Sequence, residues 1–186
     1  MLPSKESKNM ELTVQGIRDS IGAIPDYPKP GIIFRDITPL LQNPAAFELA
    51  INTLKQRYKQ SGITQIAAIE ARGFIFGSAL AYAMGCGVTL LRKPGKLPGK
   101  VVSQSYDLEY GSDELQMHEN ALTANDRVLI VDDLLATGGT VVAAHKLIKA
   151  TGAEVEEAAF VVSLPELGGE DKLQQAGVAC YTLCQF

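Results

Sequence analysis

The stretch Arg127-Val-Leu-Ile-Val-Asp132-Asp133-Leu-Leu-Ala136-Thr137-Gly138-Gly139-Thr140 decides the fold of this chain, together with residues 141–148 that follow it. Its residues 128–131 are apolar and rich in β-branched side chains, which is typical of a buried strand. After Thr140, apolar residues recur at helical spacing. The stretch therefore predicts a strand, a loop that begins with two carboxylates, and a helix.

The turn between this strand and this helix has the features of a phosphate-binding loop. The first N–H groups of a helix lack an intrahelical partner and the helix dipole is positive there, so an anion is favoured. Gly138 and Gly139 let the backbone approach a phosphate closely, and the hydroxyls of Thr137 and Thr140 add donors. The turn is therefore predicted to bind a phosphate group.

Asp132 and Asp133 require a different partner, because they would repel a phosphate at contact distance. Ionised carboxylates only accept hydrogen bonds, which suits vicinal ribose hydroxyls or a hydrated Mg²⁺. A lone aspartate before a turn usually caps a helix, but two adjacent acids before Thr-Gly-Gly-Thr favour a ligand site at a strand end. The sequence contains neither a P-loop nor a Gly-x-Gly-x-x-Gly motif. The pattern therefore indicates a sugar phosphate.

Composition favours one compact domain without nucleic-acid or membrane partners. The chain has 186 residues, 46% of them hydrophobic, and a net charge of −4, so no overall positive field attracts nucleic acid. No apolar run has membrane-spanning length, and the polar N-terminus lacks the apolar core of a secretory signal. We therefore expect a cytoplasmic protein.

Predicted strands and helices alternate along most of the chain. Helices are expected at 10–21, 44–61, 74–84, 141–152 and 168–175, and strands at 66–69, 88–91, 128–131, 155–164 and 178–186. Segments 101–108 and 114–118 are predicted to form a hairpin. This order predicts an α/β fold with an open, mostly parallel sheet flanked by helices.

A basic loop follows the strand predicted at 88–91. Four cations lie within nine residues, among prolines and glycines that exclude regular structure: Arg92, Lys93, Lys96 and Lys100. A solvated charged loop is the ordinary interpretation of such a run. Beside a phosphate-binding loop, a lid that closes over a pyrophosphate is the better one.

The stretch around Asp132 closely resembles the motif with which the type I phosphoribosyltransferases bind 5-phosphoribosyl-1-pyrophosphate (PRPP). The resemblance covers almost the whole chain from about Asp26, with four motifs in the family order. It implies that residues 1–186 form a single domain of the type I phosphoribosyltransferase fold. A small N-terminal hood would span about 11–42, and a flexible lid loop about 92–113.

The resemblance also implies roles for the residues around PRPP. Asp132 and Asp133 would hold the ribose hydroxyls, and the loop of Ala136, Thr137, Gly138, Gly139 and Thr140 would wrap the 5′-phosphate. Glu70-Ala71-Arg72-Gly73 is similar to the loop of the adenine-specific members in which the arginine binds the leaving pyrophosphate. Taken alone, Arg72 would fit a surface ion pair equally well. The lid would add Arg92, Lys93 and Lys96, and Mg²⁺ is expected to bind through PRPP and water rather than directly to the protein.

Further motifs resemble the parts of the adenine-specific members that handle the base. Leu108-Glu109-Tyr110-Gly111 implies that Glu109 exchanges a proton with N7 of adenine, and that Tyr106 and Tyr110 belong to the lid. Without the resemblance Glu109 would not be selected, because a glutamate beside a hairpin turn is usually exposed. The hood resembles theirs as well, which implies that adenine contacts Ile33, Phe34, Arg35 and Leu167.

The resemblance as a whole implies a purine salvage enzyme that forms AMP and pyrophosphate from adenine and PRPP. The family is typically homodimeric, and its lid arginine can reach the partner's site. Two alternatives stay open: a regulatory protein of the same fold that senses PRPP, and a transferase for hypoxanthine, guanine or orotate. The lack of a basic surface pattern counts against the regulatory protein.

Overall fold

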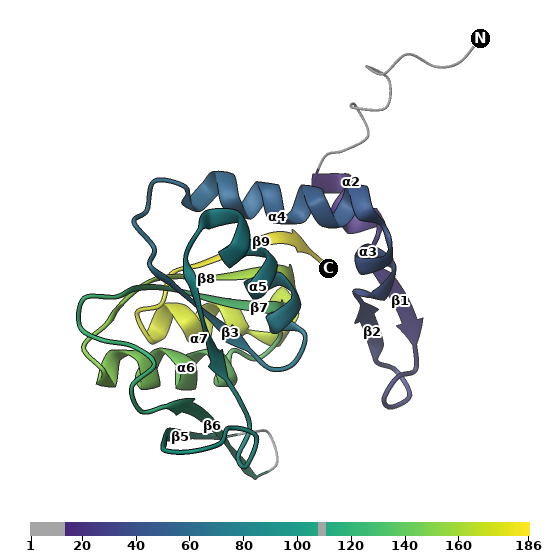
Figure 1. Ribbon diagram of the computed structural model, residues 1–186. Helices are drawn as coiled ribbons and strands as arrows, with labels where there is room; N and C mark the ends of the chain where they lie inside the picture. The colour runs from purple at the N-terminus through teal and green to yellow at the C-terminus, as the bar shows by residue number, and fades with distance from the viewer. Residues whose placement is uncertain (1–13, 108–110) are drawn as a thin grey trace. The chain divides into compact units, whose positions relative to one another are not determined.

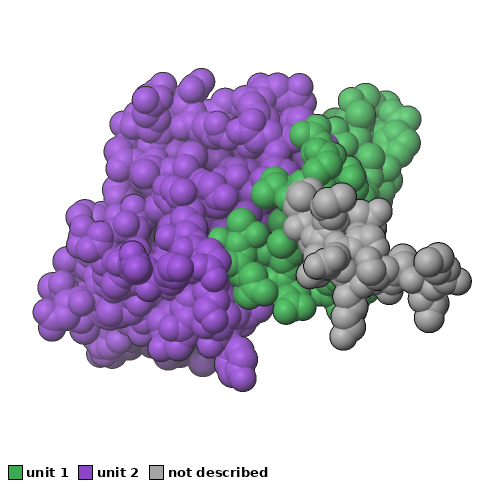
Figure 2. Space-filling view, turned by 90° about the horizontal axis from the view of Figure 1, so that it is seen from above, with its two compact units in different colours: residues 1–53 green, residues 54–186 purple. Residues whose placement is uncertain are grey.

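The computed structural model describes residues 14–107 and 111–186 of the chain (Figure 1). The chain forms two compact units, which Figure 2 shows in different colours; the first ends at Thr53 and the second runs from Leu54 to Phe186. The single domain with a hood at about 11–42 stays a prediction, because two compact units can still fold as one domain.

The first unit contains short helices and one hairpin. Its elements are α2 (Val14–Asp19), β1 (Gly22–Pro25), β2 (Ile33–Asp36), α3 (Thr38–Gln42) and the first part of α4 (Pro44–Tyr58). Helix α4 begins as predicted, since Asn43 Oδ1 accepts from the N–H groups of Ala45 and Ala46 at 3.2 Å and proline occupies the first turn. The antiparallel pairing of β1 with β2 was not predicted from the sequence.

The second unit is built on a parallel sheet of five strands in the order β4-β3-β7-β8-β9. The strands are β3 (Gln65–Ile69), β4 (Gly87–Leu91), β7 (Arg127–Leu135), β8 (Glu154–Ser163) and β9 (Cys180–Gln185). Helix α5 (Gly73–Met84) lies on one face, and α6 (Gly139–Ala150) and α7 (Gly169–Gln175) lie on the other (Figure 1). The predicted α/β fold with a parallel sheet is confirmed.

Residues 128–131 of β7 form the centre of the second unit's core. All four side chains are fully buried, as are Phe160 on β8 and Ile66 on β3. A parallel strand covered by helices on both faces buries every side chain, so its sequence is a continuous apolar run rather than an alternating one. This explains why the apolar stretch before Asp132 identified the central strand.

The order of the strands creates a crevice between β3 and β7. From β3 the chain continues outward to β4, whereas from β7 it continues in the opposite direction to β8 and β9. At such a switch point the loops after two neighbouring parallel strands diverge, and the space between them binds ligands. The loops in question are residues 70–72 after β3 and residues 136–138 after β7.

The basic loop leads from β4 into an antiparallel hairpin. Strands β5 (Val101–Asp107) and β6 (Ser112–His118) pair as predicted. Arg92 pairs with Gln116 through two backbone hydrogen bonds of 2.9 and 2.7 Å, which attach the start of the loop to β6. Across the described ranges, no helix has the length and apolar character needed to cross a membrane.

Candidate active site

The two acids of the central motif lie in strand β7 rather than in the loop after it. Strand β7 pairs with β3 only as far as Val131, but it continues along β8 to Leu135. The prediction that the strand ends at Val131 was therefore wrong, because pairing on the β8 side alone sustains it. From Asp132 onward, the β3 side of β7 faces the crevice.

Arg72 and Asp133 meet across this crevice. Arg72 follows β3, and its Nε lies 2.6 Å from Oδ2 of Asp133 in an ion pair that lacks hydrogen-bond alignment. The carboxylate is only 6% exposed, whereas the arginine side chain is 45% exposed. A carboxylate buried to this extent requires a charged partner. The two residues predicted to hold the ribose and the pyrophosphate are thus brought into contact.

Asp132 lies under the start of helix α5. Its Oδ1 accepts a hydrogen bond of 2.9 Å from the backbone N–H of Asp133. Burial, together with the negative charge of Asp133, raises the pKa of the Asp132 carboxyl well above its usual value of 3.8. A Cβ on Gly73 would lie 2.8 Å from both this Oδ1 and the carbonyl of Val131, so only glycine allows α5 to begin so close to the acid.

The loop after β7 forms a small pocket at the N-terminus of helix α6. Gly138 has a φ of +76°, a conformation that favours glycine, and it precedes the first residue of the helix. The pocket has a volume of about 100 Å³ and is lined by Asp132, Leu134, Leu135, Ala136, Thr137, Gly138, Gly139, Thr140 and Val141. All five residues predicted to bind the 5′-phosphate therefore line one pocket together with Asp132.

The turn after β8 packs against the phosphate loop. Leu164 N donates to Leu135 O at 3.0 Å, which places the turn after β8 beside the phosphate loop. A Cβ built on Gly169 would lie 2.2 Å from the carbonyl oxygen of Ala136, and one on Gly138 would lie 3.0 Å from Gly169 O. The same turn carries Leu167, which is 46% exposed in the 3₁₀ helix η1 (Pro165–Leu167).

The predicted lid cations contact groups within the chain. Arg92 Nε lies 2.7 Å from Glu70 Oε2, and its Nη1 donates to the carbonyl of Lys96 at 3.0 Å. Lys93 donates to both Asp113 and Tyr106 of the hairpin, and its hydrogen bond lowers the pKa of the Asp113 carboxyl. The structure thus links Lys93 to Tyr106, two residues that the sequence assigned to the lid.

The remaining predicted residues lie in the first unit or outside the described residues. Ile33, Phe34 and Arg35 lie on β2 of the first unit, where the Phe34 ring packs edge-to-face on Tyr27 with centroids 5.2 Å apart. Glu109 and Tyr110 lie outside the described residues. Their predicted roles stay predictions.

Three residues in or beside the site were missed in the sequence. Glu70 contacts Arg92, Gly73 makes room for Asp132, and Gly169 supports the phosphate loop. Glu70 and Gly73 belong to the quoted Glu-Ala-Arg-Gly motif, but only the three-dimensional contacts distinguish them from ordinary turn residues.

Comparison with known proteins identifies the family. The model of the phosphoribosyl transferase domain family matches residues 36–179, and the chain therefore belongs to the phosphoribosyltransferase family. An adenine phosphoribosyltransferase of Idiomarina loihiensis is 86% identical over 177 residues, which cover 95% of this chain and 100% of that protein.

Solved structures give the same assignment. The crystal structure of adenine phosphoribosyltransferase from Thermoanaerobacter pseudethanolicus is 45% identical, with a TM-score of 0.89 over 94% of this chain and 100% of that one. The Saccharomyces cerevisiae enzyme, complexed with an imino-altritol bisphosphate and adenine, is 37% identical, with a TM-score of 0.86 over 92% of this chain and 98% of that one. Within its family, the chain thus groups with the adenine phosphoribosyltransferases.

Proposed function

We propose that this protein transfers the 5-phosphoribosyl group of PRPP to adenine, forming AMP and pyrophosphate in purine salvage. The observation that carries the proposal is the arrangement of Arg72, Asp133 and the phosphate loop around one crevice, in a chain whose close relatives bear the name of this enzyme. Those names favour the enzyme over a protein that only senses PRPP.

The contacts in the crevice support a role for each group. The pocket at the start of α6 would bind the 5′-phosphate through backbone N–H groups and the helix dipole. Asp132 and Asp133 would accept hydrogen bonds from the ribose hydroxyls. Arg72 would exchange its contact with Asp133 for one with pyrophosphate, since a guanidinium binds both kinds of oxyanion. The chain would thus hold PRPP at both ends and fix C1′ for attack by adenine N9.

Mg²⁺ is part of the proposal. The donor set beside the phosphate loop consists of carboxylate oxygens, which are the ligands that Mg²⁺ prefers, and Mg²⁺ usually keeps several waters. Asp132 and Asp133 would hold the hydrated ion together with PRPP. When bound, Mg²⁺ would neutralise charge on the departing pyrophosphate. Glu109 as the group that moves the base proton, and the cytoplasmic location, stay predictions.

The proposal is tested by supplying the purified protein with PRPP, Mg²⁺ and one base at a time. We expect AMP from adenine and no nucleotide from hypoxanthine, guanine or orotate. Omitting Mg²⁺ should abolish the product, because the leaving pyrophosphate then keeps its full charge. A protein that binds PRPP but forms nucleotide with none of the four bases would contradict the proposal.

We also propose that the protein is a homodimer and that α5 and the edge strand β4 form its interface. Val88 and Leu90 are register partners of Ile66 and Ala68, which face Gly77 of α5, so they lie on the α5 face of the sheet. Each is 38% exposed at the sheet edge. On α5, Ile75 is 40% and Tyr82 is 92% exposed. Exposed apolar side chains on one edge strand and the helix beside it are typical of interaction surfaces.

Replacing Leu90 with lysine should weaken the dimer, because an interface would bury the new charge without a partner. We expect the dimer dissociation constant to rise at least about tenfold, measured by sedimentation velocity over a concentration series. The matched control is Val14→Lys on α2, where the wild-type side chain is 45% exposed. A Leu90→Lys protein as dimeric as the wild type would rule out this surface.

A further inference from the structure

The side chain of Glu70 links the two loops that carry the cations predicted to bind pyrophosphate. Glu70 directly follows β3 and precedes Arg72 by two positions, and its Oε2 lies 2.7 Å from Nε of Arg92 at the start of the basic loop. Its backbone N–H also donates to Leu91 O at 3.0 Å. Only 13% of the Glu70 side chain is exposed, so water screens this ion pair less than a surface pair.

Arg92 transmits this contact to the rest of the basic loop. Its Nη1 donates to Lys96 O at 3.0 Å, and Lys96 N donates in turn to Lys93 O at 3.3 Å. The guanidinium carbon also lies 5.7 Å from the centroid of the Phe74 ring on α5. A planar guanidinium held at Nε has a defined orientation, so the carboxylate of Glu70 fixes the turn from Lys93 to Lys96 through Arg92.

A carboxylate at this position is unexpected if charge alone matters. Glu70 adds a negative charge close to loops that are proposed to bind a highly charged anion, and by Coulomb's law it opposes that binding. Its geometry accounts for its presence. We infer that Glu70 is a positioning residue for the proposed reaction: it orients Arg92 and the turn that follows, so that these cations are preorganised for the pyrophosphate part of PRPP. The inference rests on the proposed function.

If only the charge of Glu70 mattered, Glu70→Gln would lower the KM for PRPP. If Glu70 positions Arg92, the same change should raise it. Glutamine keeps the size of the side chain but removes the charge that holds the guanidinium. If Glu70 positions Arg92, the KM for PRPP should rise about fivefold while the KM for adenine stays within about twofold, because a hydrogen bond to a charged group is weakened. A KM for PRPP that is unchanged or lower in initial-rate measurements would overturn the inference.

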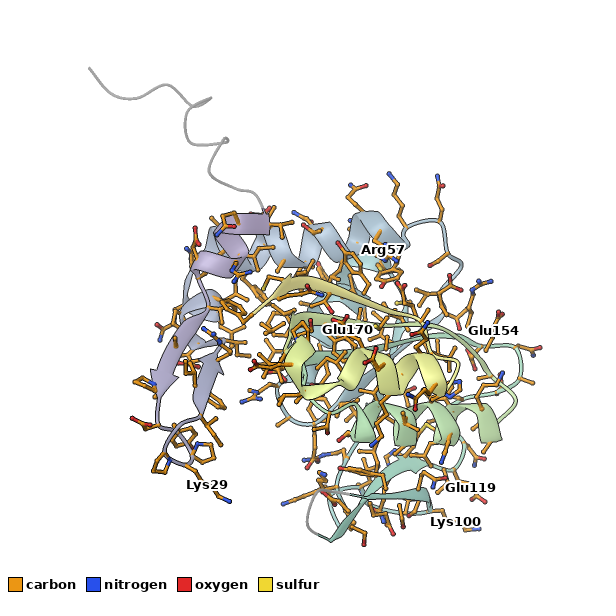
Figure 3. All side chains as sticks on the ribbon, turned by 180° about the vertical axis from the view of Figure 1, so that it is seen from behind. Lys29, Arg57, Lys100, Glu119, Glu154 and Glu170 are labelled. Atoms are coloured by element: carbon orange, nitrogen blue, oxygen red, sulfur yellow. The ribbon has the colours of Figure 1, made fainter. Side chains whose placement is uncertain are left out.

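The matched control is Glu157→Gln. Glu157 is 12% exposed and its Oε2 lies 2.8 Å from Arg57 Nε, an ion pair of similar length and burial. Its carboxylate also accepts from Arg57 Nη2 and from the Tyr58 hydroxyl, so it has more contacts to lose than Glu70. Figure 3 shows Arg57 well apart from Lys100, the last cation of the basic loop. Glu157→Gln should lower the Tm at least as much as Glu70→Gln and leave the KM for PRPP unchanged. Equal rises in this KM in both variants would mean that Glu70 is merely structural, and would overturn the inference.

A second comparison tests whether Glu70 acts through Arg92. In an Arg92→Ala background, Glu70→Gln should raise the KM for PRPP no further, because the group that it positions is gone. A full fivefold rise in that background would overturn the inference. The wild-type protein separates this result from the larger proposal: no AMP from adenine would overturn the proposed function, whereas an active wild type with an unaffected Glu70→Gln variant would overturn only the role of Glu70.

Discussion

Replacing Gly169 with alanine should lower kcat/KM for PRPP about a hundredfold. The new Cβ would lie 2.2 Å from the carbonyl oxygen of Ala136 and 3.0 Å from Leu135 Cδ1. The first neighbour is a backbone atom of the phosphate loop, and the second is a side-chain atom of the residue just before the loop. The loop itself must therefore move. A displacement of about 1 Å at a substrate-positioning group can reduce a rate about a hundredfold. The effect should appear mainly in the KM for PRPP, in initial-rate measurements with adenine saturating.

The control separates a displaced phosphate loop from general damage to helix α7. Gly177, two residues beyond the end of the same helix, has a φ of +72° and open space around its Cβ position. Gly177→Asn keeps a residue that tolerates this conformation, and it should leave the KM for PRPP within about twofold. Wild-type PRPP kinetics in Gly169→Ala would show that the contact with Ala136 does not position the loop.

The central motif could be predicted from sequence because its signals are local. The apolar run before Asp132, the Thr-Gly-Gly-Thr turn and the helical spacing after it each occur within a few residues, and they agree with one another. The structure confirms the parallel sheet and brings Arg72 to Asp133. The length of β7 could not be predicted, because it depends on pairing with β8, which lies some twenty residues further along the chain.

The elements that were missed depend on contacts between distant parts of the chain. Strands β1 and β2 are short and mostly exposed or half-exposed, so they lack the alternation of apolar and polar residues that marks a strand. Gly169 is one of 17 glycines, and nothing local distinguishes it; its role follows only from the carbonyl of Ala136, 33 positions earlier. Contacts between residues distant in the sequence are therefore what the structure adds to the motif.

Asp132→Asn should make the protein more stable and less active. The pKa of Asp132 is raised above 3.8, so above that raised value the folded state bears the full cost of ionising a half-buried acid beside Asp133. Below about 3.8 the carboxyl is protonated in both the folded and the unfolded state, and this cost vanishes. An asparagine is never charged and so avoids the cost of ionisation, yet its Oδ1 can still accept the hydrogen bond from Asp133 N.

We therefore expect the Tm of Asp132→Asn to exceed that of the wild type by about 2 to 4 °C at pH 7.5, roughly 1 kcal/mol for a chain of this size. Differential scanning calorimetry should show this gain shrinking as the pH falls toward 3.8. At the same time kcat/KM for PRPP should fall about tenfold to a hundredfold, because a charged acceptor for the ribose hydroxyls is lost.

Asp126→Asn, immediately before the same strand, should lower the Tm instead of raising it. Hydrogen bonds from Thr123 N and from the Thr64 hydroxyl, each 2.8 Å long, lower the pKa of Asp126 below 3.8. Its carboxylate therefore stabilises the fold above about pH 3.8, and its loss should lower the Tm at pH 7.5 while leaving PRPP kinetics unchanged. A lower Tm in Asp132→Asn as well would mean that Asp132 stabilises the fold. If Asp132→Asn raises the Tm and Asp126→Asn lowers it, Asp132 is retained although it lowers the stability of the fold. A residue with a purely structural role would not have this effect.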